Sequence, residues 1–319
     1  MLDLVFMGTA TFALPSLRAV CAAGHRVLAV VTQPDRPRGR GLRLQPPPVK
    51  ELALSLGLPV MQPEKARDPD FVAALQRLAP QAIVVVAYGQ ILRRAVLDLP
   101  PLGCVNLHAS LLPELRGAAP IAWAILRGYR ETGNTTIFMD EGMDTGDIIL
   151  QEREPISPDD TAGDLAHRLA PRGAELLCRT LALIEAGEAP RIPQDPARAT
   201  YAPMLTPADG CIDWSEPAEA IRNRIHGCNP VPGASATRHG VRVKLWRAAA
   251  VESEEAAAAG TVIAVTASGP LLRAGEGAVL LRELQVEGRG RVTGSEFVRG
   301  YRPQVGERWG PGQADAPRA

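Results

Sequence analysis

The chain has 319 residues, of which 46% are hydrophobic and 22% are charged, and its formal net charge is zero. This length exceeds that of one average domain, so one or two domains are expected, and the composition is ordinary for a soluble globular protein. A net charge of zero excludes a global basic field that would attract a polyanionic partner to the whole surface.

The cysteines and the first residues indicate a compartment. The five cysteines are scattered and form no Cys-x-x-Cys pair, so we expect reduced, mostly core side chains in a cytosolic protein and no structural zinc. Residues 1–8 lack the basic start and long apolar run of a secretory leader, and no segment reaches the length of a membrane span. The expectation is a cytoplasmic protein with no metal and no membrane contact, and a monomer is the default.

Apolar runs alternate with helical patterns in the first half of the chain. An apolar run at 2–7 ends at Gly8 and is followed by a helical pattern at 12–22, which is the opening of a Rossmann-like unit. No Gly-x-Gly-x-x-Gly motif is present, so NAD binding is not supported. Strands that alternate with helices predict an α/β fold with a parallel-rich sheet covered on both faces. The further expected elements are strands at 27–32, 60–61 and 81–87, the last of them central in the sheet, and helices at 49–56, 69–78, 120–126 and 161–186.

Residues 33–48 form a basic stretch that holds Arg36, Arg38, Arg40 and Arg43 among glycines and prolines. These glycines and prolines forbid a helix, so we expect a long, flexible loop. Most charged runs are solvated linkers. This one interrupts a compact strand–helix unit, where connections are normally short, and such loops more often serve a ligand or partner. Arginines there suit RNA phosphates and can stack on exposed bases.

Two polar residues of catalytic type lie at the end of a β-prone run, 104–107. Side chains alternate between faces along a strand, so Asn106 and His108 point the same way at its C-terminal end. In an open α/β sheet ligands bind at that edge, and an amide donor beside an imidazole can polarise a carbonyl and stabilise an oxyanion. The alternative is that His108 only caps the strand through a backbone hydrogen bond. From this pair alone, the capping role is favoured.

A second stretch, 140–147, follows a β-prone run and is dense in carboxylates and glycines. Glycines allow a sharp turn and a close approach to a ligand. Asp144 lies in the middle of the turn, where it can reach a neighbouring strand end and favour the charged form of a histidine. The alternatives are a tight turn with Asx-type bonds or a calcium loop. Calcium is not expected, because no glutamate closes a twelve-residue ligand loop.

The character of the chain changes after Gly187. Residues 189–207 contain five prolines and no periodicity, which indicates a linker. Beyond it we expect a small β-domain with one short helix, which gives the boundaries 1–188 for a catalytic domain, 189–207 for the linker and 208–319 for the C-terminal domain. The elements expected there are a helix at 217–226 and strands at 242–245, 261–265 and 279–284.

The two polar stretches together resemble the folate-dependent formyltransferase superfamily. The resemblance is carried by Asn106-x-His108, by the turn from Ser110 to Pro113 and by Asp144 in a Gly-x-Asp-Thr-Gly loop. It implies that Asn106, His108 and Asp144 are a catalytic trio that transfers a formyl group from 10-formyltetrahydrofolate to an amine. It also implies that the small C-terminal β-barrel is OB-like, a fold that commonly binds oligonucleotides, although a small β-domain alone could equally pack without binding a ligand. The resemblance implies that the pterin lies against residues 88–92 and 140–144, contacted largely by backbone. The folate-binding residues that it implies are Ser110, Leu111, Leu112, Pro113, Tyr88, Gly89, Leu92 and Asp140.

Further stretches indicate which amine receives the formyl group, since the members of that superfamily act on different amines. Residues 32–41 and 116–121 resemble the branch that formylates methionyl-tRNA, and so do three C-terminal stretches, 201–206, 212–214 and 229–234. The resemblance implies that the acceptor is the α-amino group of methionyl-initiator-tRNA. It implies tRNA binding by Arg36, Arg38, Arg40 and Arg43.

Some residues depart from that branch, and two other functions remain open. Basic residues are usual in that branch at the positions of Met204, Pro207 and Cys211, and an aromatic residue is usual at Val231. We therefore expect the C-terminal domain to bind tRNA more weakly or through other residues. A formyltransferase for sugar amines or for purine synthesis is one alternative, against which the basic loop and the C-terminal domain argue. A non-catalytic folate- or RNA-binding protein is the other, against which the intact trio argues.

Overall fold

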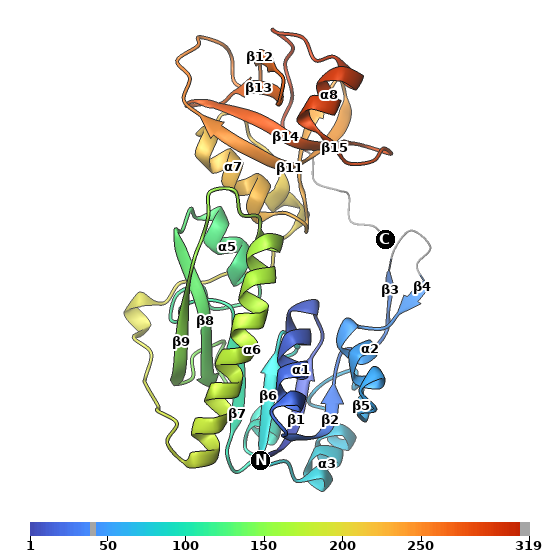
Figure 1. Cartoon of the computed structure of the whole chain (residues 1–319), viewed down its shortest axis with the longest axis vertical. Helices are drawn as coiled ribbons and strands as arrows, with labels where there is room; N and C mark the ends of the chain where they lie inside the picture. Colours follow the sequence, from blue (N-terminus) through green and yellow to red (C-terminus); the bar gives the residue numbers. More distant parts are fainter. Residues whose placement is uncertain (39–42, 313–319) are drawn as a thin grey trace. The chain divides into compact units, whose positions relative to one another are not determined.

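The structure is a computed structural model that describes residues 1–38 and 43–312 (Figure 1). The chain divides into two compact units, each assembled from separate segments. Unit 1 comprises Met1–Pro120, Thr132–Pro155 and Ala166–Pro203, and unit 2 comprises Ile121–Glu131, Ile156–Leu165 and Met204–Ala319. The expected contiguous boundaries, 1–188, 189–207 and 208–319, stay a prediction.

Unit 1 is built on a seven-stranded sheet in the order β5-β2-β1-β6-β7-β8-β9. The first five strands are parallel, and β8 runs antiparallel to β7. After β1, β2 and β5 the chain returns to the other side of β1, where β6 is the middle strand of the sheet, as predicted. The strands are β1 (Asp3–Gly8), β2 (Arg26–Val31), β5 (Val60–Met61), β6 (Ala82–Val86), β7 (Cys104–His108), β8 (Glu131–Phe138) and β9 (Ile148–Pro155).

Helices cover both faces of this sheet, and the alternation of side chains decides which residues meet which helices. Leu4 and Phe6 of β1 pack with α1, α2 and α6, whereas Val5 and Met7 pack with α3 and α4. In β7, Cys104 belongs to the core on the side of α3 and α4, so Asn106 and His108 lie on that face. The helices of the unit are α1 (Leu14–Ala22), α2 (Pro48–Ser55), α3 (Pro69–Leu78), α4 (Arg94–Leu97) and the larger part of α6 (Ala162–Ala186).

The basic stretch differs from the flexible loop that was expected. Its ends form a separate antiparallel ribbon of β3 (Arg36–Arg38) and β4 (Arg43–Gln45), in which Arg36 pairs with Gln45 and Arg38 with Arg43 (Figure 1). Proline is compatible with an extended edge strand, since it only removes one donor. The prolines that forbid a helix therefore do not forbid this ribbon. Arg40 lies outside the described residues.

The segment that was expected to be a linker is paired with unit 1. Ile192 exchanges two backbone hydrogen bonds with Ile148, and Arg116 donates its backbone N–H to Thr200 and accepts from Ala202. Prolines interrupt any regular ladder here, but the remaining backbone groups still find partners. We call residues 192–202 the strap, because they tie β9 and the chain after β7 together.

Unit 2 contains an antiparallel sheet in the order β10-β11-β14-β13-β12, with β15 paired to β14. The final segment forms bridges to both edges of the sheet, from Gly310 to Thr237 and from Arg308 to Thr261, and so closes it around a core that includes Trp214, Phe297 and Trp309. The strands are β10 (Ala234–Arg238), β11 (Val241–Val251), β12 (Val262–Thr266), β13 (Gly269–Arg273), β14 (Ala278–Val286) and β15 (Val292–Thr293). The helices are α7 (Ala218–Gly227), α8 (Gly294–Tyr301) and most of α5 (Pro120–Leu126).

The pattern of the sequence did not predict β9, β10, β13, β15, α4 and α8, whose apolar runs are short or interrupted, nor the ribbon strands β3 and β4. Within residues 1–38 and 43–312, no helix combines the length and the apolar character needed to span a membrane.

Candidate functional site

Asn106, His108 and Asp144 meet at the C-terminal half of β7. The Asn106 amide Nδ2 lies 3.3 Å from Asp144 Oδ1, to which it donates, and His108 Nδ1 lies 3.6 Å from Asp144 Oδ2. Met139 donates its backbone N–H to the carbonyl of Cys104, and the loop after it turns back across the face of β7. The three residues predicted to form the trio therefore converge, although Asp144 is 36 positions beyond His108 in the sequence.

The orientation of His108 follows from its second nitrogen. His108 Nε2 lies 2.9 Å from the carbonyl oxygen of Leu115, which can only accept, so Nε2 carries a hydrogen and donates it. The ring is 6% exposed, and its Nδ1 edge faces Asp144. The backbone bond that was considered as the alternative role of His108 is therefore present, and it leaves Nδ1 turned to the carboxylate.

Asp144 is held in an unusual backbone conformation, with φ of 55°. Its Oδ2 accepts a hydrogen bond of 2.8 Å from the backbone N–H of Gly117. Gly117 has φ of 119°, and a Cβ there would lie 2.8 Å from the carbonyl oxygen of Ala202 in the strap, so only glycine fits this close approach. The carboxylate position depends on a donor that no other residue type can supply without displacing the strap.

Asp140 holds the same loop from the other end. Its Oδ1 accepts from the backbone N–H of Gly142 at 3.0 Å and from Thr145 Oγ1 at 2.6 Å. These are the Asx-type bonds that were considered as an alternative for the stretch. They belong to Asp140 and leave the Asp144 side chain free to face β7.

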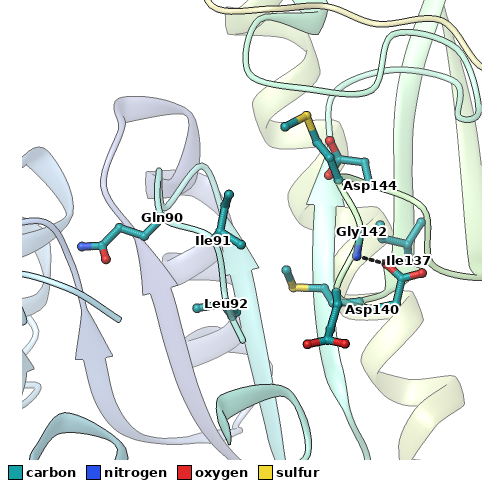
Figure 2. Close-up of a pocket in the computed structure, with 10 residues that line it drawn as sticks. Gln90, Ile91, Leu92, Ile137, Asp140, Gly142 and Asp144 are labelled. Carbon is teal, nitrogen blue, oxygen red and sulfur yellow. Dashed lines mark hydrogen bonds between the residues drawn. The ribbon is translucent and has the colours of Figure 1, made fainter. Parts of the chain in front are cut away.

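A pocket of about 150 Å³ lies beside the trio. In Figure 2 the segment after β6 that holds Gln90, Ile91 and Leu92 lies opposite the loop of Asp140 and Asp144, and the Gln90 side chain is directed away from that loop. Leu92, Asp140 and Asp144 were expected to take part in a site. Most of the other lining residues belong to the two stretches, 88–92 and 140–144, against which the pterin was expected to lie, and the large exposed fractions of Ile91 (65%) and Met143 (57%) mark the pocket on the structure. The lining residues that sequence reasoning missed are Ile137 and Met139.

Tyr88 and Gly89 lie behind the pocket rather than on its wall. The Tyr88 side chain is 2% exposed in the core beside α3 and α4, and its backbone carbonyl accepts from Thr9 Oγ1 and Gln33 Nε2. Burial raises the pKa of Tyr88 to about 12. Gly89, with φ of 85°, lets the chain turn from β6 toward Gln90. Both residues shape the segment that lines the pocket.

The turn from Ser110 to Pro113 is packed into unit 1 and does not line this pocket. Ser110 Oγ donates to the carbonyl of Glu114 at 2.6 Å, and the Ser110 carbonyl accepts from Thr135 Oγ1 at 2.6 Å. Leu112 is buried with Ile137 and Ile148, while Leu111 is half-buried and Pro113 is buried. The turn directs the chain so that the Leu115 carbonyl reaches His108.

Three of the four arginines expected to bind RNA, Arg36, Arg38 and Arg43, belong to the ribbon, and Arg40 lies outside the described residues. Arg36 is exposed and lies 3.8 Å from Glu64, a surface pair that contributes little energy. Arg38 and Arg43 are opposite each other in the ribbon register. This arrangement gathers positive charge on an element separate from the sheet. In the described part of the chain, no group of three or more His, Cys, Asp or Glu side chains is arranged to hold a metal ion.

Comparisons with known proteins assign the family. Residues 3–181 match the model of the formyl transferase family, and residues 204–302 match the model of the formyl transferase C-terminal domain. The methionyl-tRNA formyltransferase of Symbiobacterium thermophilum is 53% identical over 316 residues, which cover 98% of this chain and 97% of that protein. That of Moorella thermoacetica is 52% identical, with 95% and 98% covered.

Among solved structures, HypX from Aquifex aeolicus in complex with tetrahydrofolic acid matches with a TM-score of 0.64 at 18% identity. The match covers 96% of this chain and 48% of that one, so this chain spans about half the length of that protein, and the likeness concerns the fold alone. The two matched domains and the identity of about half over nearly the full length lead to one conclusion. The chain belongs to the methionyl-tRNA formyltransferase family.

Proposed function

We propose that this protein transfers a formyl group from 10-formyltetrahydrofolate to the α-amino group of methionyl-initiator-tRNA. The observation that carries the proposal is the convergence of Asn106, His108 and Asp144 beside a pocket, in a chain whose relatives are named for this reaction. Formyl transfer to an amine requires an acceptor for a proton and a donor for the carbonyl oxygen that becomes negative. The trio offers both.

Asn106 is assigned to the formyl oxygen. Its amide has two N–H groups, and the bond to Asp144 uses one of them. The second can donate to the formyl oxygen, where an oxyanion develops as the amine attacks. The side chain is 9% exposed, so water competes little for that donor.

His108 and Asp144 are assigned to proton transfer. Because His108 Nε2 is engaged by the Leu115 carbonyl, Nδ1 is the nitrogen that can exchange a proton on the side of Asp144. His108 would stabilise the oxyanion or protonate the departing N10 nitrogen, and Asp144 would orient the imidazole. Through a water molecule, Asp144 would also accept the proton that the amine loses.

The pocket fits the ring system of a folate. Ile91, Leu92 and Met139 supply apolar walls, while the backbone of the Asp140–Asp144 loop supplies polar groups at its edge. Leu92 and Asp140 would therefore contact the folate directly, whereas Tyr88, Gly89 and the Ser110–Pro113 turn would support the site from behind. The folate carries the formyl group, and the residues that line the pocket would orient it.

The basic ribbon is assigned to the tRNA. Arg36, Arg38 and Arg43 belong to β3 and β4, which lie outside the seven-stranded sheet, and Arg40 is two positions after Arg38 in the sequence. Arginine is a residue type that binds RNA phosphates. Positive charge on a projecting ribbon suits the acceptor end of an RNA, whose bases are accessible there. The oligomeric state proposed is a monomer, and the compartment is the cytoplasm.

The experiment is a formylation assay with 10-formyltetrahydrofolate and methionine-charged initiator tRNA, with uncharged tRNA and glycinamide ribonucleotide as comparison acceptors. Formylmethionyl-tRNA that forms only when both substrates are present is the expected result. If glycinamide ribonucleotide is formylated and charged tRNA is not, the proposed acceptor is wrong. If no amine is formylated, the proposed reaction is wrong.

The trio is tested in the same assay. Asn106→Ala, His108→Ala and Asp144→Ala should each lower kcat by about 10²- to 10³-fold, which is the usual loss for a removed oxyanion donor. His167→Ala is the matched control, because His167 is exposed on α6. If the unfolding midpoints of the variants are unchanged, the loss of kcat is due to the chemistry and not to unfolding. Near-normal rates in all three variants would mean that the site lies elsewhere.

A further inference from the structure

Gln194, in the strap, contacts the loop that carries Asp144. Its Nε2 donates to the carbonyl oxygens of Asp144 and Gly146, each at 2.8 Å. Its Oε1 accepts from Arg116, at 3.1 Å from Nε and 2.6 Å from Nη2. One amide therefore joins three segments that are far apart in the sequence.

Only an amide satisfies both sides of this contact. The guanidinium of Arg116 has donors and no acceptor, and the two backbone carbonyls can only accept. A side chain between them must accept at one end and donate at the other, which fixes the orientation of the Gln194 amide. Arg116 is 5% exposed, so its donors cannot turn to bulk water instead.

The contact bears on the geometry of the site because of the conformation of Asp144. A left-handed conformation at a residue other than glycine persists only when its surroundings hold it. The carboxylate is held by Gly117 and Asn106, and the backbone oxygen of the same residue is held by Gln194. Releasing the backbone would let the carboxylate move relative to His108, from which it is 3.6 Å away.

We propose that Gln194 is a positioning residue, which keeps Asp144 in line with His108 and Asn106 and is itself oriented by Arg116. The inference rests on the proposed function of Asp144. Gln194 contributes to turnover through Asp144 alone, since its hydrogen bonds to the loop go to backbone atoms.

The kinetic test uses Gln194→Glu, which keeps the size of the side chain and the bond to Arg116 but replaces the donor toward the loop by a second oxygen. A displacement of about 1 Å in a reacting group can cost about 10²-fold, so we expect kcat to fall about 10- to 100-fold with the KM for tRNA unchanged. In an Asp144→Asn background the same substitution should cause no further loss, because residues that act as one unit are not additive. A full additional loss in that background would overturn the proposal.

Gln285→Glu is the matched control. Gln285 in unit 2 also uses both ends of its amide, accepting from Trp246 Nε1 at 3.2 Å and donating to the Arg289 carbonyl at 2.8 Å. The chemical change is identical, but the residue has no bond to the loop of Asp144. We expect its kcat to equal that of the unchanged protein.

A second measurement decides the proposal without any turnover. Hydrogen exchange of the amides of residues 140–148 should be several-fold faster in Gln194→Glu than in the unchanged protein, and not in Gln285→Glu. Equal exchange would overturn the proposal whatever the reaction is. Faster exchange with an unchanged kcat would overturn it as well, because Gln194 would then hold the loop without serving the chemistry. Absence of formyl transfer in the unchanged protein would refute the proposed function, and the exchange result would still test the contact.

Discussion

Asp144 is held from three separate parts of the chain, two of which bond its carboxylate and one its backbone carbonyl oxygen. Asn106 approaches from β7, Gly117 from the segment that follows β7, and Gln194 from the strap. Each bond alone contributes about 1 kcal/mol to stability, so none of them would fix the residue by itself. Together they hold a left-handed conformation that a free chain would leave, and this preorganises the site before a substrate binds.

Tyr88 shows how a residue beside the site can serve the fold instead of the ligand. Its hydroxyl oxygen is enclosed and has no hydrogen-bond partner among the described residues, and burial raises the pKa of Tyr88 to about 12. The hydroxyl is therefore neutral at physiological pH and still loses its bonds to water on folding, which is costly.

We expect Tyr88→Phe to raise the free energy of unfolding by about 1 kcal/mol, because the unsatisfied hydroxyl is removed and the ring is kept. The KM for 10-formyltetrahydrofolate should not change. Urea unfolding followed by circular dichroism measures the first quantity, and initial rates measure the second. A less stable variant would mean that the hydroxyl has a partner, and a raised KM would mean that it touches the folate.

At the scale of elements, the ribbon of β3 and β4 carries charge without contributing to the sheet. Two strands alone have marginal stability in water, and this pair belongs to neither the seven-stranded sheet nor the sheet of unit 2. Its backbone register pairs Arg36 with Gln45 and Arg38 with Arg43. Three arginines of the sequence thus belong to one small element, which fits a role in binding RNA phosphates.

The ribbon is tested by combining Arg36→Ala, Arg38→Ala and Arg43→Ala. We expect the KM for tRNA to rise and the KM for folate to stay the same, because phosphate contacts act on the RNA alone. Each lost contact should also reduce the slope of log affinity against log salt by about 1. Arg77→Ala, which removes an exposed arginine from the last turn of α3, is the control. If the triple variant has an unchanged KM for tRNA and an unchanged salt slope, the ribbon is only a linker and does not bind tRNA.

At the scale of the whole molecule, each of the two units has its own core, and their stabilities can be followed separately. The four tryptophans of the chain, Trp123, Trp214, Trp246 and Trp309, all belong to unit 2. Tryptophan fluorescence therefore reports the unfolding of unit 2 while unit 1 contributes no signal of its own.

His226 makes the stability of unit 2 depend on pH. It is 2% exposed and accepts from the backbone N–H of Ala248 through Nε2. Burial, followed by the positive charges of Arg222 and Arg247, lowers the pKa of His226 to about 4. The unfolded chain, with a pKa near 6.5, binds a proton in the interval between these values while the folded chain does not. Stability is therefore full above pH 6.5 and is lost as the pH falls toward 4.

We expect unit 2 to lose about 2 kcal/mol more between pH 7 and pH 5 than a His226→Gln variant does, because only the histidine takes up a proton on unfolding. Urea unfolding at the two pH values, followed by tryptophan fluorescence, measures the difference. Comparing the two pH values within each protein removes the packing cost of the substitution. Equal pH dependence in both proteins would mean that folding does not lower the pKa of His226.

Much of the candidate site could be predicted from local sequence, because alternation along a strand is a local property. Asn106 and His108 are two residues apart in a β-prone run, so they had to share a face once the strand formed. The partners of these side chains could not be predicted in the same way. The Leu115 carbonyl, the Gly117 amide and the Gln194 side chain carry no motif of their own, and Gln194 reaches Asp144 across 50 positions of sequence.

The sequence by itself determined the alternation of strands and helices, the central place of β6, the face shared by Asn106 and His108, and the family. These follow from hydrophobic periodicity and from contiguous motifs, which need no knowledge of distant contacts. Only the tertiary structure decided that β8 runs antiparallel to β7, that residues 192–202 form a strap, and that the final segment closes the sheet of unit 2. The reason is physical. Such pairings satisfy backbone groups between segments that meet only after the chain has folded, and no local pattern of residues encodes which segments will meet.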